Sequence, residues 1–210
     1  MTVPGALSPP GRKGSKQRIL EAAFELFAEK GYDGTTTRSI AKRAGVNEVT
    51  LFRSFGSKEA LFRQAALDML PLRRIKEGVD FGAEGTPEEV LVRNARLVLG
   101  ILRENRHIFM ILVGELWRHP KLKEEVGTEV FDQAVQFVTG QMQVMIADGR
   151  LRDVDPFVAA RSWMGTVQSH FLLNYLIGPG QLDPDAEERL LRGWADIFVN
   201  GAGRRGDGKR

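Results

Sequence analysis

Apolar residues recur every three or four positions over most of the chain, which is the spacing of one buried face of an α-helix. The first such stripe is followed by Gly31, and glycine commonly closes a helix in a left-handed conformation. Few segments show the alternation of apolar and polar residues that is typical of a half-buried strand, so the sequence predicts an all-α fold. The first stripe consists of Ile19, Ala22, Ala23, Leu26 and Phe27.

Capping residues mark several helix starts. Ser15 can cap the first helix, and Thr86 opens a T-P-E-E sequence, which is a capping box with a proline in the first turn. Asp155 and Asp183 each precede a proline in the same way. Residues 76–86 are rich in glycine and lack an apolar stripe, so we expect the loop between two domains there.

One apolar run, from Ile108 to Val113, has a composition that also suits a buried strand. Its flanks and the lack of a partner strand favour a helix instead. We therefore expect a buried helix over this run.

The segment from Thr35 to Lys58 contains two short helical patterns around one glycine. Thr36 or Thr37 can cap the first helix, over Arg38 to Ala44. Its inner face would be Ile40, Ala41 and Ala44. Small Ala41 would let two helices cross closely.

The glycine, Gly45, stands at the turn, where the lack of a Cβ atom permits a positive φ. Asn47 can cap the second helix, in which Leu51 and Phe55 lie one turn apart and point inward. The pattern is typical of a helix-turn-helix unit. The outer face of its second helix is a surface able to enter a major groove, and it carries Glu48, Val49, Thr50, Phe52, Arg53 and Ser54.

The chain has 210 residues and no cysteine. This length suits one sizeable core, or a small domain joined to a larger one. Disulfides, zinc–thiolate sites and thiol nucleophiles are excluded. The sequence has no signal-peptide pattern and no apolar run of bilayer length, so we expect a cytoplasmic protein without a membrane segment.

Positive charge gathers at the start of the chain. Residues 1–60 hold ten Lys and Arg against six Asp and Glu, a net charge of +4, and the remaining residues sum to −1. Such a distribution suits a polyanionic partner, although a solvated charged surface would also explain it. Residues 1–14 resemble a flexible basic arm, and residues 201–210 a disordered tail.

Residues 15–62 resemble the DNA-binding domain of the TetR family of bacterial transcriptional regulators. The family pattern runs F-x-x-x-G-Y/F, then T-T/S-x-x-x-I-A-x-x-A-G-V, then T-L-Y-x-x-F-x-S/N-K-x-x-L. This chain has LFAEKGYDGTTTRSIAKRAGV and TLFRSFGSKEALF in the same order. The resemblance implies a three-helix reading head at residues 15–62, with a larger helical regulatory and dimerisation domain at residues 63–200.

The resemblance also implies which residues contact DNA. Thr37 and Arg38 would contact the backbone, and Lys58 would share a phosphate with the start of the fourth helix. Phe52 replaces the family's usual tyrosine, so the ring remains but the hydroxyl that bonds phosphate is lost. The full predicted set is Thr36, Thr37, Arg38, Asn47, Glu48, Val49, Thr50, Phe52, Arg53, Ser54 and Lys58.

Glu48 is unusual in a surface expected to face phosphate. Its carboxylate repels phosphate but can accept a hydrogen bond from a cytosine amino group. It would equally favour the start of its own helix through the helix dipole. The sequence leaves both roles open.

The helix predicted after Asp155 is apolar on two faces, and the last helix supplies a further stripe. One face can pack within the subunit, while the other is available to a twofold partner, as the family's last two helices are. A monomeric core is the alternative. The predicted homodimer interface consists of Phe157, Met164, Val167, Phe171, Leu190, Trp194 and Phe198.

Bulky apolar residues upstream resemble plain core, but in the family this region encloses a small-molecule pocket. The predicted ligand-binding set is Phe109, Met110, Trp117, Phe137, Met142, Trp163 and His170. His170 could orient a ligand or satisfy a core carbonyl, and the second role is preferred. The three histidines have no metal-binding spacing, and we expect no metal and no cofactor.

These features favour a ligand-responsive transcriptional repressor that binds a palindromic operator as a homodimer and takes a small apolar ligand. An enzyme would need a nucleophile–base pair, paired carboxylates, a metal cluster or a phosphate loop, and none is found in the sequence. The alternative is a non-sensing DNA-binding activator or architectural protein.

Overall fold

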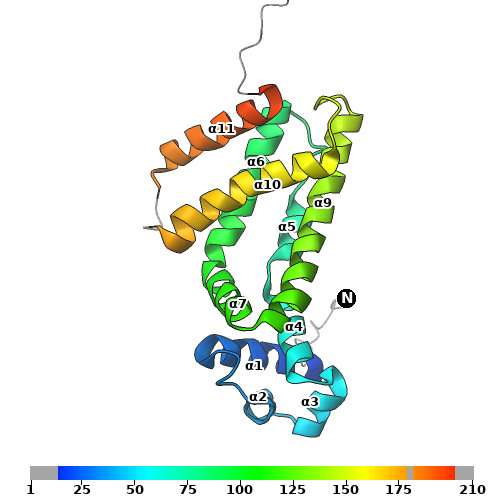
Figure 1. The fold of residues 1–210 in the computed structure, drawn as a ribbon, viewed down its shortest axis with the longest axis vertical. Coiled ribbons are helices and arrows are strands. Elements are labelled where there is room, and N and C mark those ends of the chain that lie inside the picture. Colours follow the sequence, from blue (N-terminus) through cyan, green and yellow to red (C-terminus); the bar gives the residue numbers. More distant parts are fainter. Residues whose placement is uncertain (1–13, 179–181, 202–210) are drawn as a thin grey trace, which may run out of the picture.

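The computed structural model describes residues 14–178 and 182–201 of the chain (Figure 1). Within these residues it contains helices and no strand, which confirms the all-α prediction. The predicted arm at 1–14 and tail at 201–210 lie outside the described residues, apart from residues 14 and 201. None of the described helices is both long and apolar enough to cross a bilayer.

The α-helices are α1 (Ser15–Lys30), α2 (Thr37–Ala44), α3 (Glu48–Phe55), α4 (Lys58–Met69), α5 (Leu72–Gly78), α6 (Pro87–Glu104), α7 (Arg106–Arg118), α8 (Pro120–Leu122), α9 (Thr128–Ala147), α10 (Pro156–Phe171) and α11 (Pro184–Asn200). Two π-helical segments, η1 (Lys123–Gly127) and η2 (Leu172–Ile177), continue α8 and α10.

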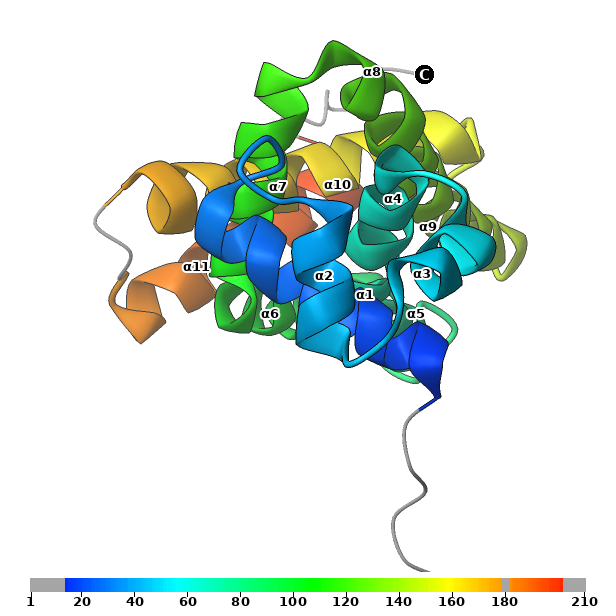
Figure 2. The ribbon, with the colours of Figure 1, turned by 90° about the horizontal axis from the view of Figure 1, so that it is seen from below.

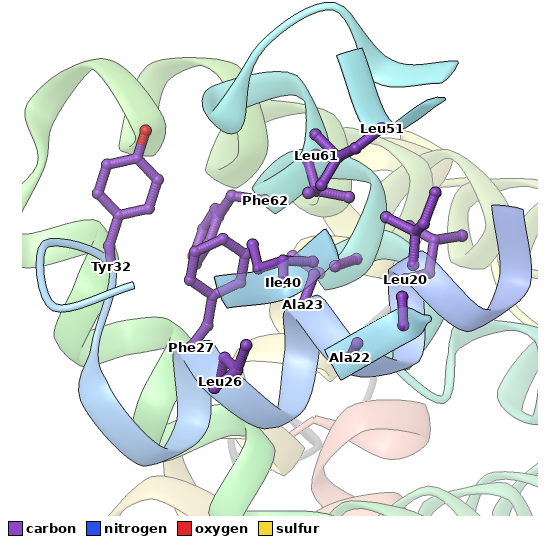
Figure 3. Packing of buried hydrophobic residues seen from close by; sticks show 14 of the residues in the cluster. Leu20, Ala22, Ala23, Leu26, Phe27, Tyr32, Ile40, Leu51, Leu61 and Phe62 are labelled. Carbon is purple, nitrogen blue, oxygen red and sulfur yellow. The ribbon is translucent and has the colours of Figure 1, made fainter. Parts of the chain in front are cut away.

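The first four helices pack around one small core. α1 lies across α2 and α4, and α3 contacts each of the other three. Figure 3 shows how the apolar faces of these helices converge. Ile19, Ile40, Leu51 and Leu61 have no exposed surface. Burial of such side chains supplies most of the stability of a domain this small.

Local capping fixes the helix-turn-helix geometry. Thr36, rather than Thr37, caps α2 and forms a capping box with Ser39. Gly45 adopts the left-handed conformation expected of it (φ 65°, ψ 41°), and Asn47 caps α3 by accepting a hydrogen bond from the Val49 backbone N–H at 2.9 Å. Ser15 does not cap α1, because it is already the first helical residue and Gly14 precedes it without a side chain.

The turn after α1 is held from inside. Gly31 has a positive φ of 72°, as predicted, but its ψ of 175° carries the chain onward in an extended path. Thr35 is fully buried, and its hydroxyl donates to the backbone oxygens of Leu26 and Gly31 at 2.9 and 2.8 Å. These bonds tie the end of α1 to the start of α2.

The larger C-terminal domain, called the regulatory domain after its expected role, includes two pairs of contacting helices, since α9 packs against α10 and α6 packs against α11 (Figure 1). The run from Ile108 to Val113 is helical, as predicted, within α7. It is not buried on every side, because Ile108 and Leu112 face the core while Met110 and Val113 are exposed. The helix covers one side of the core only.

Residues 76–86, predicted as a loop between the two domains, pack against the larger domain. α5 reaches into it as far as Gly78, and Val79 and Phe81 are buried. The Asn94 side chain binds the backbone N–H and carbonyl of Asp80 at 3.1 and 2.9 Å. The expected capping box at Thr86 then starts α6.

A partly buried polar cluster joins α6, α10, η2 and α11. Glu187 accepts from the Tyr175 hydroxyl at 2.7 Å and from Arg103 at 3.0 Å, and its other contact is His170 Nε2 at 3.0 Å. Burial raises the pKa of the Glu187 carboxyl, but the bonds from Tyr175 and His170 and the charge of Arg103 outweigh it, so the pKa is lowered. Glu187 is therefore ionised at neutral pH.

Replacing Thr35 by valine should destabilise the reading head, because valine keeps the shape but leaves two buried carbonyls without their hydroxyl donor. We expect a loss of about 1–3 kcal/mol in the free energy of unfolding, measured by urea denaturation. Thr35→Ser retains the hydroxyl and is the matched control. Equal losses for both variants would show that packing of the methyl group, not the hydroxyl, matters here.

Candidate nucleic-acid interface and ligand cavity

The residues predicted to contact DNA gather at one end of the molecule. Figure 2 looks onto this end, where α2 and α3 lie side by side in front of α1 and α4. All eleven predicted residues are at least partly exposed. Local bonds occupy several of them, since Thr36 and Asn47 cap helices and the Ser54 hydroxyl donates to the Thr50 carbonyl at 2.8 Å.

Glu48 is bound by a residue from the neighbouring helix. The Thr37 hydroxyl donates to Glu48 Oε1 at 2.6 Å and so joins the first residues of α2 and α3. Sequence reasoning assigned Thr37 to phosphate and missed this contact, which links residues eleven positions apart. A carboxylate has two oxygens, so the bond orients Glu48 without using up its capacity to accept.

Two apolar side chains stand out on the exposed face of α3. Val49 is 71% exposed and Phe52 is 46% exposed. Both would cost free energy in water without a partner, and a thymine methyl group or a sugar ring is an apolar surface available in DNA.

Lys58 begins α4, next to the capping residue Ser57. Its ammonium lies 4.2 Å from the centre of the Tyr32 ring. Burial lowers the pKa of Lys58 and outweighs the nearby carboxylates of Asp33, Glu59 and Glu115, which act in the opposite direction. The aromatic contact was not foreseen, and it orients the cation at the edge of the head.

Arg43, a further basic residue of the head, lies on α2 and is paired with carboxylates of α1. Arg43 lies 2.9 Å from a carboxylate oxygen of Glu25 and 3.2 Å from one of Glu29, both on α1. Both Arg38 and Arg43 are exposed, but the guanidinium of Arg43 is engaged by these surface ion pairs.

The regulatory domain contains a partly open apolar cavity of about 310 Å³, lined by residues of α5, α6, α7, α9 and α10. Of the residues predicted to bind a ligand, Phe109, Phe137 and Trp163 line it. Its polar wall residues are Lys76, Asn94 and Gln168, and Asn94 is already engaged by Asp80. The volume and apolar lining fall within the range typical of small-molecule sites.

The other four predicted ligand residues do not line this cavity. Met142 is wholly buried in the core, and Met110 and Trp117 point outward from α7. His170 binds Glu187 and Asn174, so it neither faces the cavity nor satisfies the core carbonyl that we preferred for it. Helical spacing alone could not separate these residues from the lining set.

The cavity walls that sequence reasoning missed come from α5 and α6. Ile75, Val98 and Leu102 are among them. They carry no distinctive signal, because an apolar stripe has the same appearance whether it faces a neighbouring side chain or an empty space. A broader groove between α7 and the start of α9 shares Val113 and Phe131 with the cavity.

The predicted dimer residues divide into two groups. Met164, Val167 and Phe171 point into the subunit's own core, because α10 packs along α9 on that side. Trp194 and Phe198 are half-buried against the same core, while Phe157 and Leu190 are exposed. Other exposed apolar side chains of α10, η2 and α11 are Val158, Leu173, Ile177 and Ile197.

Within the described residues, no group of three His, Asp or Glu side chains could hold a metal ion.

Comparison with known proteins agrees with this architecture. A family model described as "Bacterial regulatory proteins, tetR family" matches residues 19–65. A second, described as "AefR-like transcriptional repressor, C-terminal domain", matches residues 89–200. The uncharacterised HTH-type transcriptional regulator YerO of Bacillus subtilis (strain 168) is 26% identical over 180 residues, which cover 82% of this chain and 60% of YerO.

Solved structures share the fold. The flavonoid-responsive regulator FrrA has a TM-score of 0.73 at 24% identity, covering 91% of this chain and 98% of that one. FadR from Bacillus subtilis, solved in complex with stearoyl-CoA, has a TM-score of 0.66 at 21% identity, covering 89% of this chain and 99% of that one. The helix-turn-helix head, the larger helical domain and the two family models together show that the chain belongs to the TetR family of bacterial regulatory proteins.

Proposed function

We propose that this chain is a transcriptional repressor that binds a palindromic operator as a homodimer and releases it when an apolar ligand enters the regulatory domain. The observation that carries the proposal is the joint presence of an exposed helix-turn-helix face and an apolar cavity in one chain. A non-sensing architectural protein would have no use for such a cavity. No reaction is assigned to the chain.

The proposed DNA contacts fall into two kinds. Arg38 and Lys58 bind phosphate and fix the position of the head, since a cation at a helix start suits an anion. Glu48, Val49 and Thr50 at the start of α3 contact base edges. Glu48, oriented by Thr37, accepts from a cytosine amino group, and Val49 packs on a thymine methyl group.

The proposed dimer uses the exposed face of α10, η2 and α11. Leu173 and Ile177 on η2 and Leu190 and Ile197 on α11 are apolar side chains that water would otherwise surround. A twofold axis through this face would join two helix pairs into a four-helix bundle. The half-sites of the operator should then lie about one helical turn apart, roughly 34–36 Å, or a multiple of it.

The proposed ligand is mostly apolar, because nearly all of the cavity wall is. Lys76 is the one cationic residue among the wall residues named for the cavity, and it favours a ligand with a single anionic or accepting group. FadR was solved in complex with stearoyl-CoA and FrrA is described as flavonoid-responsive, and both kinds of compound have large apolar parts. Either class is a reasonable starting point for a screen.

Alanine at Arg38 or Lys58 should weaken binding to all DNA sequences and reduce the slope of log affinity against log salt by about one unit each. Glu48→Ala should instead change the preferred sequence and leave the salt slope in place. Binding titrations at several salt concentrations measure both effects. Arg43→Ala is the matched control, because that cation is paired with Glu25 and Glu29 and should leave the slope unchanged.

Leu173→Arg should convert the dimer into a monomer, because burying an unpaired charge in the interface costs about 3–5 kcal/mol. The variant should stay folded, since Leu173 is exposed within the subunit. Val144→Arg, at an exposed position of α9, is the control and should remain dimeric. Sedimentation distinguishes the two, and a wild-type monomer that binds a palindrome tightly would refute the proposed assembly.

A compound that enters the cavity should raise the melting temperature and release the operator, and DNA should weaken its binding by the same factor. The screen would test fatty acids, acyl-CoA thioesters, flavonoids and steroids by thermal shift. Val138→Trp fills the cavity and should abolish the shift, whereas Val144→Trp on the outer side of α9 should not. A hit that stabilises the protein without releasing DNA would show that the cavity is not a sensor.

A further inference from the structure

We infer that Glu115, a residue of the regulatory domain that lies outside the predicted DNA-contacting set, positions the reading head for DNA binding. The inference rests on the proposed function in one respect, which is that residues 15–62 bind DNA. It adds a specific contact through which the larger domain determines where the head lies. The contact is made at the C-terminal end of α7.

Glu115 is a buried carboxylate, with 4% of its surface exposed. Its Oε2 accepts a hydrogen bond from the backbone N–H of Tyr32 at 3.1 Å, across 83 positions of sequence. Its Oε1 accepts from Arg118 at 3.0 Å, and His119 Nε2 lies 3.4 Å from Oε2. A buried carboxylate needs hydrogen-bond donors, and the head supplies one of them through the backbone N–H of Tyr32.

The turn of the head is shaped to receive this carboxylate. Gly31 has a positive φ, and a Cβ atom added there would lie 3.1 Å from Glu115 Oε1. The backbone at Gly31 therefore lies so close to Glu115 that a residue with a Cβ atom would be crowded there. Glycine at this position serves the contact between domains as well as the end of α1.

Tyr32 transmits the position of this turn to the rest of the head. Its ring packs on Phe27 and Phe62, with ring centres 5.7 and 5.4 Å apart, and on His119 at 4.9 Å. The Lys58 ammonium lies over the same ring. Displacing the Tyr32 backbone would thus move a residue that we assign to phosphate.

A neighbouring face of α7 borders the cavity. Phe109, Leu112 and Leu116 line it, and Leu112 and Leu116 flank Glu115 within one turn of the helix. One rigid element therefore carries both a wall of the cavity and the anchor of the head. A rearrangement of α7 cannot leave the head unaffected while the bond to Tyr32 holds.

A second link between the domains provides a matched comparison. Arg63 on α4 and Glu129 on α9 form an ion pair at 2.9 Å, with side chains 42% and 34% exposed. Solvent screens such a pair, and exposed ion pairs contribute little to positioning. The buried, directional bond at Glu115 should therefore dominate.

The experiment measures amide hydrogen exchange and DNA binding for the full chain and its Glu115→Ala, Glu115→Gln and Glu129→Gln variants. The DNA is a duplex enriched from a random pool by the wild-type protein. Exchange of the Tyr32 amide should accelerate about tenfold or more in Glu115→Ala, while the Leu26 amide inside α1 keeps its protection. Affinity for the duplex should fall about tenfold, because a freely oriented head is less often in the binding position.

The salt dependence of binding should not change in Glu115→Ala, because the head makes the same phosphate contacts once it is bound. Glu115→Gln should restore most of the affinity, since its amide oxygen can still accept from Tyr32, and Glu129→Gln should leave both readouts at wild-type values. If Glu115→Ala does not fold, Glu115→Gln serves as the test. A smaller acceleration of amide exchange at Tyr32 in that variant, confined to the turn after α1, would support the same inference.

Unchanged Tyr32 exchange in the Glu115 variants, equal acceleration at Leu26, or local acceleration without loss of DNA affinity would overturn the inference. If the wild-type chain enriches no DNA at all, the proposed function fails instead, and the exchange measurement alone decides whether Glu115 holds the turn.

Discussion

The architecture depends on how the turn after α1 is held. Three kinds of contact meet at Tyr32. Its ring packs within the head, its backbone N–H donates to Glu115 of α7, and the Lys58 ammonium lies over its ring. Thr35 stabilises the same turn, because its hydroxyl donates to the backbone carbonyls of Leu26 and Gly31 at the end of α1. The orientation of the head relative to the cavity follows from these bonds together with the apolar packing of α7, α8 and η1 against the core of the head.

The reading head and the regulatory domain are continuous in packing. α4 runs from Lys58 to Met69 across the division that we expected at residue 62. Leu112 of α7 belongs to the core of the head, and Leu122 and Val126 reach the same core from beyond α7. Such shared packing explains how a cavity in one part can affect a surface in the other, because close-packed interiors shift as units.

Helix α10 illustrates what periodicity leaves undecided. Its sequence has two apolar stripes, and either could have faced a partner. The structure turns Met164, Val167 and Phe171 inward because α9 provides a long apolar surface on that side, and Glu187 on α11 fixes the neighbouring His170. Two apolar faces on a helix indicate that both need a packing partner. Which face packs within the subunit is decided by the tertiary structure.

The sequence alone determined the features that arise within a few residues of one another. Caps at Asn47 and Thr86 and the positive φ of Gly45 follow from local bonding and sterics, and the amphipathic stripes indicated an all-α fold. The choice of Thr36 over Thr37 as the cap of α2 came from the structure. The tertiary structure decided the contacts between distant positions, such as Thr37 with Glu48 and Tyr32 with Glu115. These could not be predicted, because one sequence specifies which groups need a partner but not which distant element brings that partner within hydrogen-bonding distance.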